Sequence, residues 1–181
     1  FLSPPLASSA AAIGAAGFET FSDASHSFSL KLPSSWSYSE QLLRDRRKLL
    51  VWTDPNDPST AVFIAYTPVR DDFTSLGSFG SVDQVAAQTI LPKSTLMDEN
   101  SETSATMLSA TSAKQSYFFD YVQKSKNVPE THFRTIFTLR QGATGGAGAV
   151  LVTITAQTPQ ERYDTSKSTL FDSIIDSYAV S

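Results

Sequence analysis

The chain has no cysteine, no excess of basic residues and no long apolar run. Without cysteine it can form no disulfide framework, no thiolate metal site and no cysteine nucleophile. The net charge is -4, with 14 Lys and Arg against 18 Asp and Glu, which argues against nucleic acid as a partner. No stretch approaches the roughly 18 apolar residues of a membrane-spanning helix. We therefore expect a protein that is at most peripheral to a membrane.

The 181 residues suffice for one globular domain with a hydrophobic core. Apolar residues make up 40% of the chain and aromatic residues 11%, with twelve Phe, which excludes a disordered chain. Residues 1–17 differ from the rest because they are almost wholly small and uncharged. They can be read as the end of a cleaved targeting peptide or as a flexible arm. We expect an Ala/Ser-rich N-terminal arm over residues 1–17 and one folded domain over residues 18–181.

Several segments show the residue patterns of β-strands. Residues 28–32 alternate between apolar and polar side chains, and Pro33 ends the run. Residues 60–67 are apolar on both faces, which predicts a central strand that is covered on both sides. Residues 114–123, 132–141 and 149–157 are separated by turns and predict an antiparallel meander.

Two helices complete the predicted secondary structure. Ser81 and Gln84 have the spacing of a capping box, and Pro92 would end the helix that follows. The second helix runs from Tyr163 to Tyr178, with apolar residues three or four positions apart. Strands joined as hairpins, with helices packed on the resulting sheet, predict the α+β class.

The sequence contains no specific catalytic motif. The glycines between residues 142 and 148 lack the Lys-Ser/Thr of a phosphate-binding loop, and residues 77–80 lack the spacing of a Gly-x-Ser-x-Gly elbow. Two histidines and many serines leave a Ser–His–Asp triad open in principle, but nothing selects its members. His26 is predicted to be exposed or bonded within a turn. We expect no enzyme, and a hydrolase is the weaker alternative.

Two short segments are weak candidates for binding Ca²⁺ or another divalent cation. Glu130 and His132 would lie on the same face of an extended segment and could start a metal site, although such a site needs three or four ligands. The alternative is a histidine at a strand end. Asp54 and Asp57 flank Asn56 and could offer oxygen ligands, but the same residues are typical of an ordinary turn, which is favoured.

Two other segments are candidates for docking a partner. The densest basic run in this acidic chain comprises Arg44, Arg46, Arg47 and Lys48. It is either a solvated surface or an electrostatic docking patch that steers and orients an acidic partner. Phe73 and Phe79, with Leu76 between them, are either core residues or interface anchors.

The segment that starts with these aromatic residues carries a family resemblance. Tyr66-Thr-Pro-Val-Arg-Asp-Asp-Phe-Thr-Ser-Leu-Gly-Ser-Phe-Gly-Ser-Val-Asp83 resembles the strand, loop and helix signature of the PsbP family of thylakoid-lumen proteins. Three other stretches resemble family landmarks in the same order: Phe28–Trp36, Leu50–Pro55 and Ser173–Val180, the last a helix that runs into a short strand. The resemblance covers roughly Phe18 to Ser181.

The resemblance implies an α-β-α sandwich around a central antiparallel sheet, the PsbP/Mog1-like fold. It also implies a non-enzymatic protein of the chloroplast thylakoid lumen. The founding member is an extrinsic subunit of photosystem II that helps to retain Ca²⁺ and Cl⁻ at the oxygen-evolving complex. Relatives are assembly factors of photosystem II or photosystem I, or subunits of the chloroplast NDH-like complex.

This chain departs from the founding subunit because it lacks that subunit's long Lys-rich, Asn-containing N-terminal arm and has an apolar start instead. The departure favours a PsbP-like or PsbP-domain relative. We expect an accessory protein that docks on the lumenal side of a photosynthetic membrane complex, with photosystem II favoured. The alternatives are a transient lumenal assembly factor, or a subunit or factor of photosystem I or the NDH-like complex.

Overall fold

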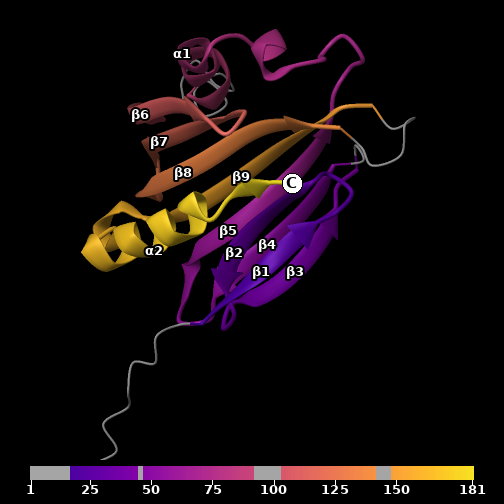
Figure 1. Ribbon diagram of the computed structural model, residues 1–181. Helices are drawn as coiled ribbons and strands as arrows, with labels where there is room; N and C mark the ends of the chain where they lie inside the picture. Colours follow the sequence, from indigo (N-terminus) through magenta and orange to yellow (C-terminus); the bar gives the residue numbers. More distant parts are fainter. Residues whose placement is uncertain (1–16, 45–46, 92–102, 142–147) are drawn as a thin grey trace, which may run out of the picture.

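The computed structural model describes residues 17–44, 47–91, 103–141 and 148–181. These residues form ten strands and a few helical segments. Figure 1 shows how these elements are arranged. The strands are β1 (Phe18–Asp23), β2 (Phe28–Pro33), β3 (Ser37–Leu42), β4 (Lys48–Asp54), β5 (Asp57–Pro68), β6 (Ser104–Ala113), β7 (Ser116–Ser125), β8 (Val128–Arg140), β9 (Val150–Pro159) and β10 (Ala179–Val180). The helical segments are η1 (Leu76–Phe79), α1 (Val82–Val85), the π-helical η2 (Ala86–Ile90), η4 (Gln160–Arg162) and α2 (Thr165–Asp176). No helix in these residues is long and apolar enough to cross a membrane.

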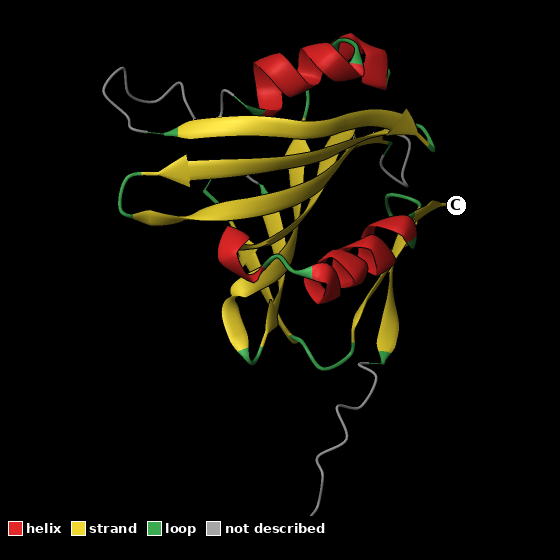
Figure 2. Cartoon of the chain, turned by 90° about the vertical axis from the view of Figure 1, so that its left-hand side faces the viewer, coloured by secondary structure: helices red, strands yellow, loops and turns green. Residues whose placement is uncertain are grey.

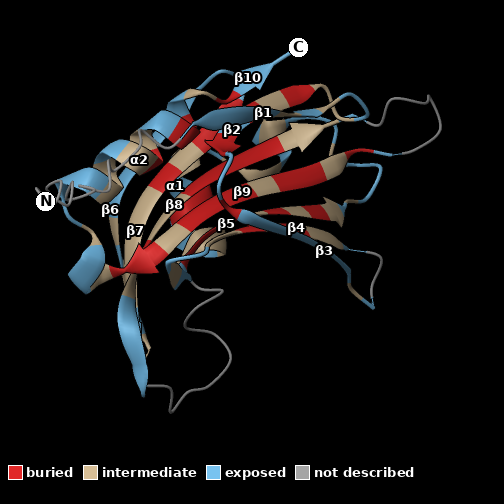
Figure 3. Ribbon diagram, turned by 90° about the horizontal axis from the view of Figure 1, so that it is seen from below, coloured by how far each residue is buried: buried red, intermediate tan, exposed pale blue. Residues whose placement is uncertain are grey.

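Seven strands form one antiparallel sheet in the order β3-β4-β5-β9-β8-β7-β6. The predicted meander is confirmed, because β7, β8 and β9 are neighbours in chain order. The predicted central position is confirmed, because β5 lies inside the sheet. Its Val62 and Ile64 are fully buried on one face, whereas Phe63 and Ala65 on the other face are half-buried. Figure 3 shows this burial along β5, β8 and β9, with β3 exposed at the rim.

The two faces of this sheet carry separate hydrophobic cores because consecutive strand residues point to opposite sides. Ile136 of β8 packs in the core that also contains residues of α2 and β2, and the next residue, Phe137, packs in the core beneath α1. Figure 2 shows helices on both sides of the large sheet. The predicted α+β class and α-β-α layering, with a central antiparallel sheet, are therefore confirmed.

Helix α2 forms where its apolar spacing predicts. The Asp164 side chain caps it by accepting a hydrogen bond from the Lys167 backbone N–H at 2.9 Å. Phe171, Ile174 and Ile175 face the sheet and are buried. The short strand β10 that follows pairs with β2, as the resemblance implies.

Three features differ from the sequence-based expectations or refine them. Strand β3 has no strand pattern in the sequence, because all six of its residues are exposed and show no buried face. The small sheet β1-β2-β10 is separate from the large one and supplies much of one layer. The Ser81–Gln84 capping box is present, but α1 continues as a π-helix over Ala86–Ile90; Pro92 lies outside the described residues.

Candidate functional site

The predicted basic run lies in the hairpin that joins β3 to β4, at the outer edge of the large sheet. The Leu43 backbone N–H donates to the Arg47 carbonyl at 2.8 Å and closes the hairpin loop. Arg44 and Arg47 are exposed, and Lys48 opens β4. Arg46 lies outside the described residues. The described part of the run is therefore a solvent-facing cationic corner.

Lys48 is partly neutralised within this corner. Its Nζ lies 3.0 Å from the Glu40 Oε1, and the Tyr38 hydroxyl donates to the other oxygen of this carboxylate at 3.1 Å. The hydrogen bond from Lys48, followed by that from Tyr38, lowers the pKa of the Glu40 carboxyl. The Lys48 side chain is still 45% exposed but shares its charge with Glu40, so Arg44 is the stronger candidate for meeting an acidic partner.

Phe73 and Phe79 lie away from this corner, in the loop that leads to α1. Their ring centroids are 4.5 Å apart, and Phe79 makes an edge contact with Phe137 of β8 at 5.2 Å. Both side chains are half-buried, and Phe79 packs on the core beneath α1. In the sheet, β8 is separated from β4 by β9 and β5. The structure thus ties Phe79 to the core and does not join the two predicted docking segments.

His132 is buried in a network of protein side chains. Its Nε2 lies 2.7 Å from the Asp120 Oδ1, its Nδ1 lies 2.8 Å from the Gln160 Oε1, and its ring stacks on Tyr163 at 3.5 Å between centroids. The side chain of Glu130 is exposed and is not among these partners. Both ring nitrogens therefore have protein partners, so His132 links β7, β8 and η4.

Asp54 and Asp57 face cations of the protein itself. Asp54 pairs with Lys167 at 3.3 Å, and Asp57 pairs with Arg162 and accepts from the Thr60 hydroxyl at 2.6 Å. Burial would raise the pKa of the Asp57 carboxyl, but the Thr60 hydrogen bond and Arg162 outweigh it, so the pKa is lowered. No group of three or more His, Asp or Glu side chains suited to a metal ion is found among the described residues.

A second polar cluster, not selected by sequence reasoning, joins the two sheets. Asp23 accepts from the Tyr66 hydroxyl at 2.7 Å, and its Oδ2 lies 2.8 Å from the His26 Nδ1. The backbone N–H of His26 also donates to Asp23 at 3.0 Å, which confirms that this histidine is bonded within its turn. Burial raises the pKa of the Asp23 carboxyl, but hydrogen bonds from Tyr66 and His26 outweigh that effect and hold it below its usual value.

This cluster borders a recess of about 270 Å³ that Lys48 and Val150 also line. The spacing from Asp23 to His26 is visible in the sequence, but the contribution of Tyr66 from β5 is not. In the described residues neither histidine is bonded to a serine hydroxyl. The serine–histidine contact that a hydrolase triad needs is therefore missing from this part of the chain.

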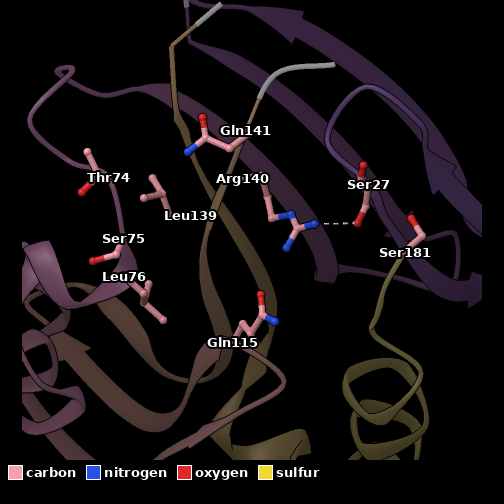
Figure 4. Close-up of a pocket in the computed structure, with 9 residues that line it drawn as sticks. All are labelled: Ser27, Thr74, Ser75, Leu76, Gln115, Leu139, Arg140, Gln141 and Ser181. Carbon is pink, nitrogen blue, oxygen red and sulfur yellow. Dashed lines mark hydrogen bonds between the residues drawn. The ribbon is translucent and has the colours of Figure 1, made fainter. Parts of the chain in front are cut away.

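Another recess, of about 520 Å³, is a polar groove between the β1–β2 turn and the loop before α1. Figure 4 shows Arg140 in its wall, with Gln115, Gln141, Thr74 and Ser75 around it. The Arg140 guanidinium donates to the carbonyls of His26 and Ser27 at 2.8 and 2.9 Å. Arg140 therefore links the turn of the small sheet to strand β8 of the large sheet. The residues that line the groove offer hydroxyl and amide groups but no pair of acidic and basic side chains suited to proton transfer.

Comparisons with known proteins agree with this architecture. The solution structure of cyanobacterial PsbP (CyanoP) from Synechocystis sp. PCC 6803 is similar, with a TM-score of 0.67 and 19% identity, covering 97% of this chain and 99% of that chain. LpqN of Mycobacterium tuberculosis, described as involved in cell envelope biogenesis, gives a TM-score of 0.43 and 13% identity, with 91% of each chain covered, and supports no conclusion. No curated protein sequence matches the chain.

The family model of PsbP matches residues 16–180, which is nearly the whole sequence. This match confirms the resemblance carried by residues 66–83, and the likeness to cyanobacterial PsbP shows that the fold is shared. The chain therefore belongs to the PsbP family.

Proposed function

We propose that this protein is a non-catalytic accessory protein that docks on the lumenal side of a photosynthetic membrane complex. The observation that carries the proposal is the family match over residues 16–180. The exposed cationic corner at Arg44 and Arg47 supports docking by charge, and the missing serine–histidine contact in the described chain speaks against a hydrolase.

Photosystem II is the favoured host, in the role of an extrinsic subunit or a factor for assembly and stability. We infer a location in the thylakoid lumen, and the chloroplast in particular. Photosystem I and the NDH-like complex are the alternative hosts. A transient assembly factor would use the same surface but leave the mature complex, so the two roles differ in stoichiometry and lifetime of binding.

The test is rebinding of the purified protein to salt-washed thylakoid membranes, with bound protein quantified at several salt concentrations. We expect charge reversal of all four basic residues, Arg44, Arg46, Arg47 and Lys48, to Glu to weaken binding about 4- to 900-fold at low salt. That range follows from ~0.2–1 kcal/mol for each exposed ion pair, taken together. The variant should also show a shallower dependence on salt, because fewer charges meet across the interface.

A matched variant controls for the change in net charge. It reverses four basic residues elsewhere: Lys31, Arg70, Lys124 and Lys126, all of which are exposed. Both variants should keep a cooperative melting transition. Equal binding by the wild type and by both variants would remove the charge-docking account, and failure of the wild type to bind any thylakoid fraction would remove the proposed function.

A further inference from the structure

The two outer strands of the large sheet differ in how their edges are protected. Strand β6 has an irregular register between Met107 and Ser109, and the intervening Leu108 is 56% exposed. Such bulges twist an edge away from further pairing. Strand β3 pairs with β4 over all six residues without a register shift. It contains neither Pro nor Lys, which natural proteins use to block edge pairing, and its one charged side chain, Glu40, is paired with Lys48.

Strand β3 continues the buried face of the sheet out to the rim. Tyr38 lies opposite Trp52 in the register, with 4.9 Å between ring centroids, and Glu40 lies opposite Leu50. Trp52 and Leu50 are buried, whereas Tyr38 is 53% exposed. Because alternate residues share a face, Leu42 lies on this side too, and it is 79% exposed. The apolar side chains of this face are therefore left uncovered at β3.

The opposite face of β3 is polar, and its C-terminal end is cationic. Ser37, Ser39 and Gln41 occupy the polar face, and Arg44 and Arg47 follow in the hairpin loop. A strand added beside β3 would thus meet Tyr38 and Leu42, with Glu40 between them, on one face, polar side chains on the other, and positive charge at one end. Figure 1 shows β3 at the margin of the sheet, and in the described chain its hydrogen-bonded neighbour is β4 alone.

We propose that β3 binds an extended acidic segment of a partner protein by β-strand addition. The mode of binding is main-chain hydrogen bonding along the edge, with apolar side chains of the partner on Tyr38 and Leu42 and carboxylates beside Arg44 and Arg47. The inference rests on the proposed docking function and adds to it the binding mode and the chemistry of the partner.

A second copy of this chain fits the edge less well. Antiparallel self-pairing of β3 would bring the hairpin loop of one copy beside the residues that precede Ser37 of the other. Those residues are Pro33, Ser34, Ser35 and Trp36, which offer no carboxylate to Arg44 or Arg47. An extended acidic segment of a partner can pair with the main chain of the β3 edge and also place carboxylates near the cationic hairpin loop.

The test uses a photo-crosslinking amino acid at Leu42, with the same substitution at Leu108 as the matched control on the bulged edge. Each full-length variant is bound to salt-washed thylakoid membranes, irradiated, and analysed by mass spectrometry. We expect Leu42 to give a crosslink at least tenfold more abundant than Leu108, to an extended, acid-rich segment. The inference is overturned if Leu42 crosslinks to a second copy or to a helical or basic segment. It is also overturned if the crosslinks from Leu42 are no more abundant than those from Leu108. Binding that persists in those cases would leave the proposed function intact.

Proline substitutions give an independent readout. Adjacent residues of an antiparallel edge strand direct their amides to opposite sides, so one of Ser39 and Glu40 points its N–H at β4 and the other points outward. We make both Ser39→Pro and Glu40→Pro. The variant at the residue whose N–H points away from β4 should keep the wild-type melting temperature. It should bind about tenfold more weakly, because it loses a main-chain donor and the proline ring obstructs pairing. If the variant that keeps native stability binds as tightly as the wild type, strand addition at β3 is contradicted.

Discussion

Replacing Tyr66 by Phe should destabilise the protein in a way that depends on pH. The substitution keeps the aromatic ring, which is buried in the main core, and removes the hydroxyl that donates to Asp23 at 2.7 Å. A hydrogen bond to a charged group contributes about 1.5–3 kcal/mol. Asp23 retains two bonds from His26, so its carboxylate is not left without partners. We therefore expect a loss near the lower end, about 1–2 kcal/mol, which lowers Tm by about 2–8 °C for a chain of this size.

The stabilisation by the Tyr66–Asp23 hydrogen bond should be lost at both acidic and strongly alkaline pH. The pKa of the Asp23 carboxyl is lowered in the folded state, so its stabilisation is complete above about pH 4 and is lost as pH falls through the lower folded pKa. The pKa of the Tyr66 hydroxyl is raised by burial and then by Asp23, so its stabilisation is complete below about pH 10 and is lost at higher pH. The difference between wild type and Tyr66→Phe should therefore be constant from pH 5 to 9 and shrink at either extreme.

The assay is urea unfolding followed by fluorescence across this pH range. Tyr38→Phe is the control, because its hydroxyl also bonds a carboxylate but lies at the surface, where substitutions change stability by about 0.5 kcal/mol or less. A Tyr66→Phe difference that stays the same down to pH 2, or that does not exceed the Tyr38→Phe difference at pH 7, would refute the assigned role of the Tyr66–Asp23 bond.

The remaining predictions concern stability at three places. Lys114→Met should cost about 1 kcal/mol in chemical denaturation, because the Lys114 ammonium donates to the carbonyls of Asp176 and Tyr178 at the C-terminal end of α2; an unchanged midpoint would contradict this. Ile154→Ala should cost about 2–5 kcal/mol in the same assay, since this side chain is fully buried between strands β5 and β8, and a loss below 1 kcal/mol would argue against that packing. Ser81→Ala should speed amide hydrogen exchange in α1 through loss of the cap, whereas Tm falls by only a few degrees; unchanged exchange would deny the cap its role.

Sequence reasoning succeeds here where burial has a simple period. The alternation of Phe28 and Leu30 with polar residues and the helical spacing of Phe171 and Ile174 both report which face is covered. Strand β3 has no such signal, because its residues are all exposed and its structure comes from pairing with β4. The β6–β7 turn is similar: Lys114 and Gln115 adopt positive φ angles that normally favour Gly or Asn, so tertiary contacts have overridden the local preference.

The candidate sites were less predictable because their partners are distant in sequence. His132 is hydrogen-bonded to Asp120 and Gln160, which come from β7 and η4. Its sequence neighbour Glu130 therefore does not indicate which side chains surround it. The basic run was visible as composition, but the internal pairing of Lys48 with Glu40 depends on the β3–β4 register. Local patterns thus identify charge, whereas the fold decides which charges remain available to a partner.

The most direct test of the central claim is native separation of solubilised thylakoid membranes, with this protein followed by mass spectrometry in salt-washed and unwashed samples. The account predicts co-migration with a photosynthetic complex in the unwashed sample and release by salt, since charge contributes to docking. Recovery in both samples only as a free species of 19.6 kDa, or outside the thylakoid fraction, would contradict it.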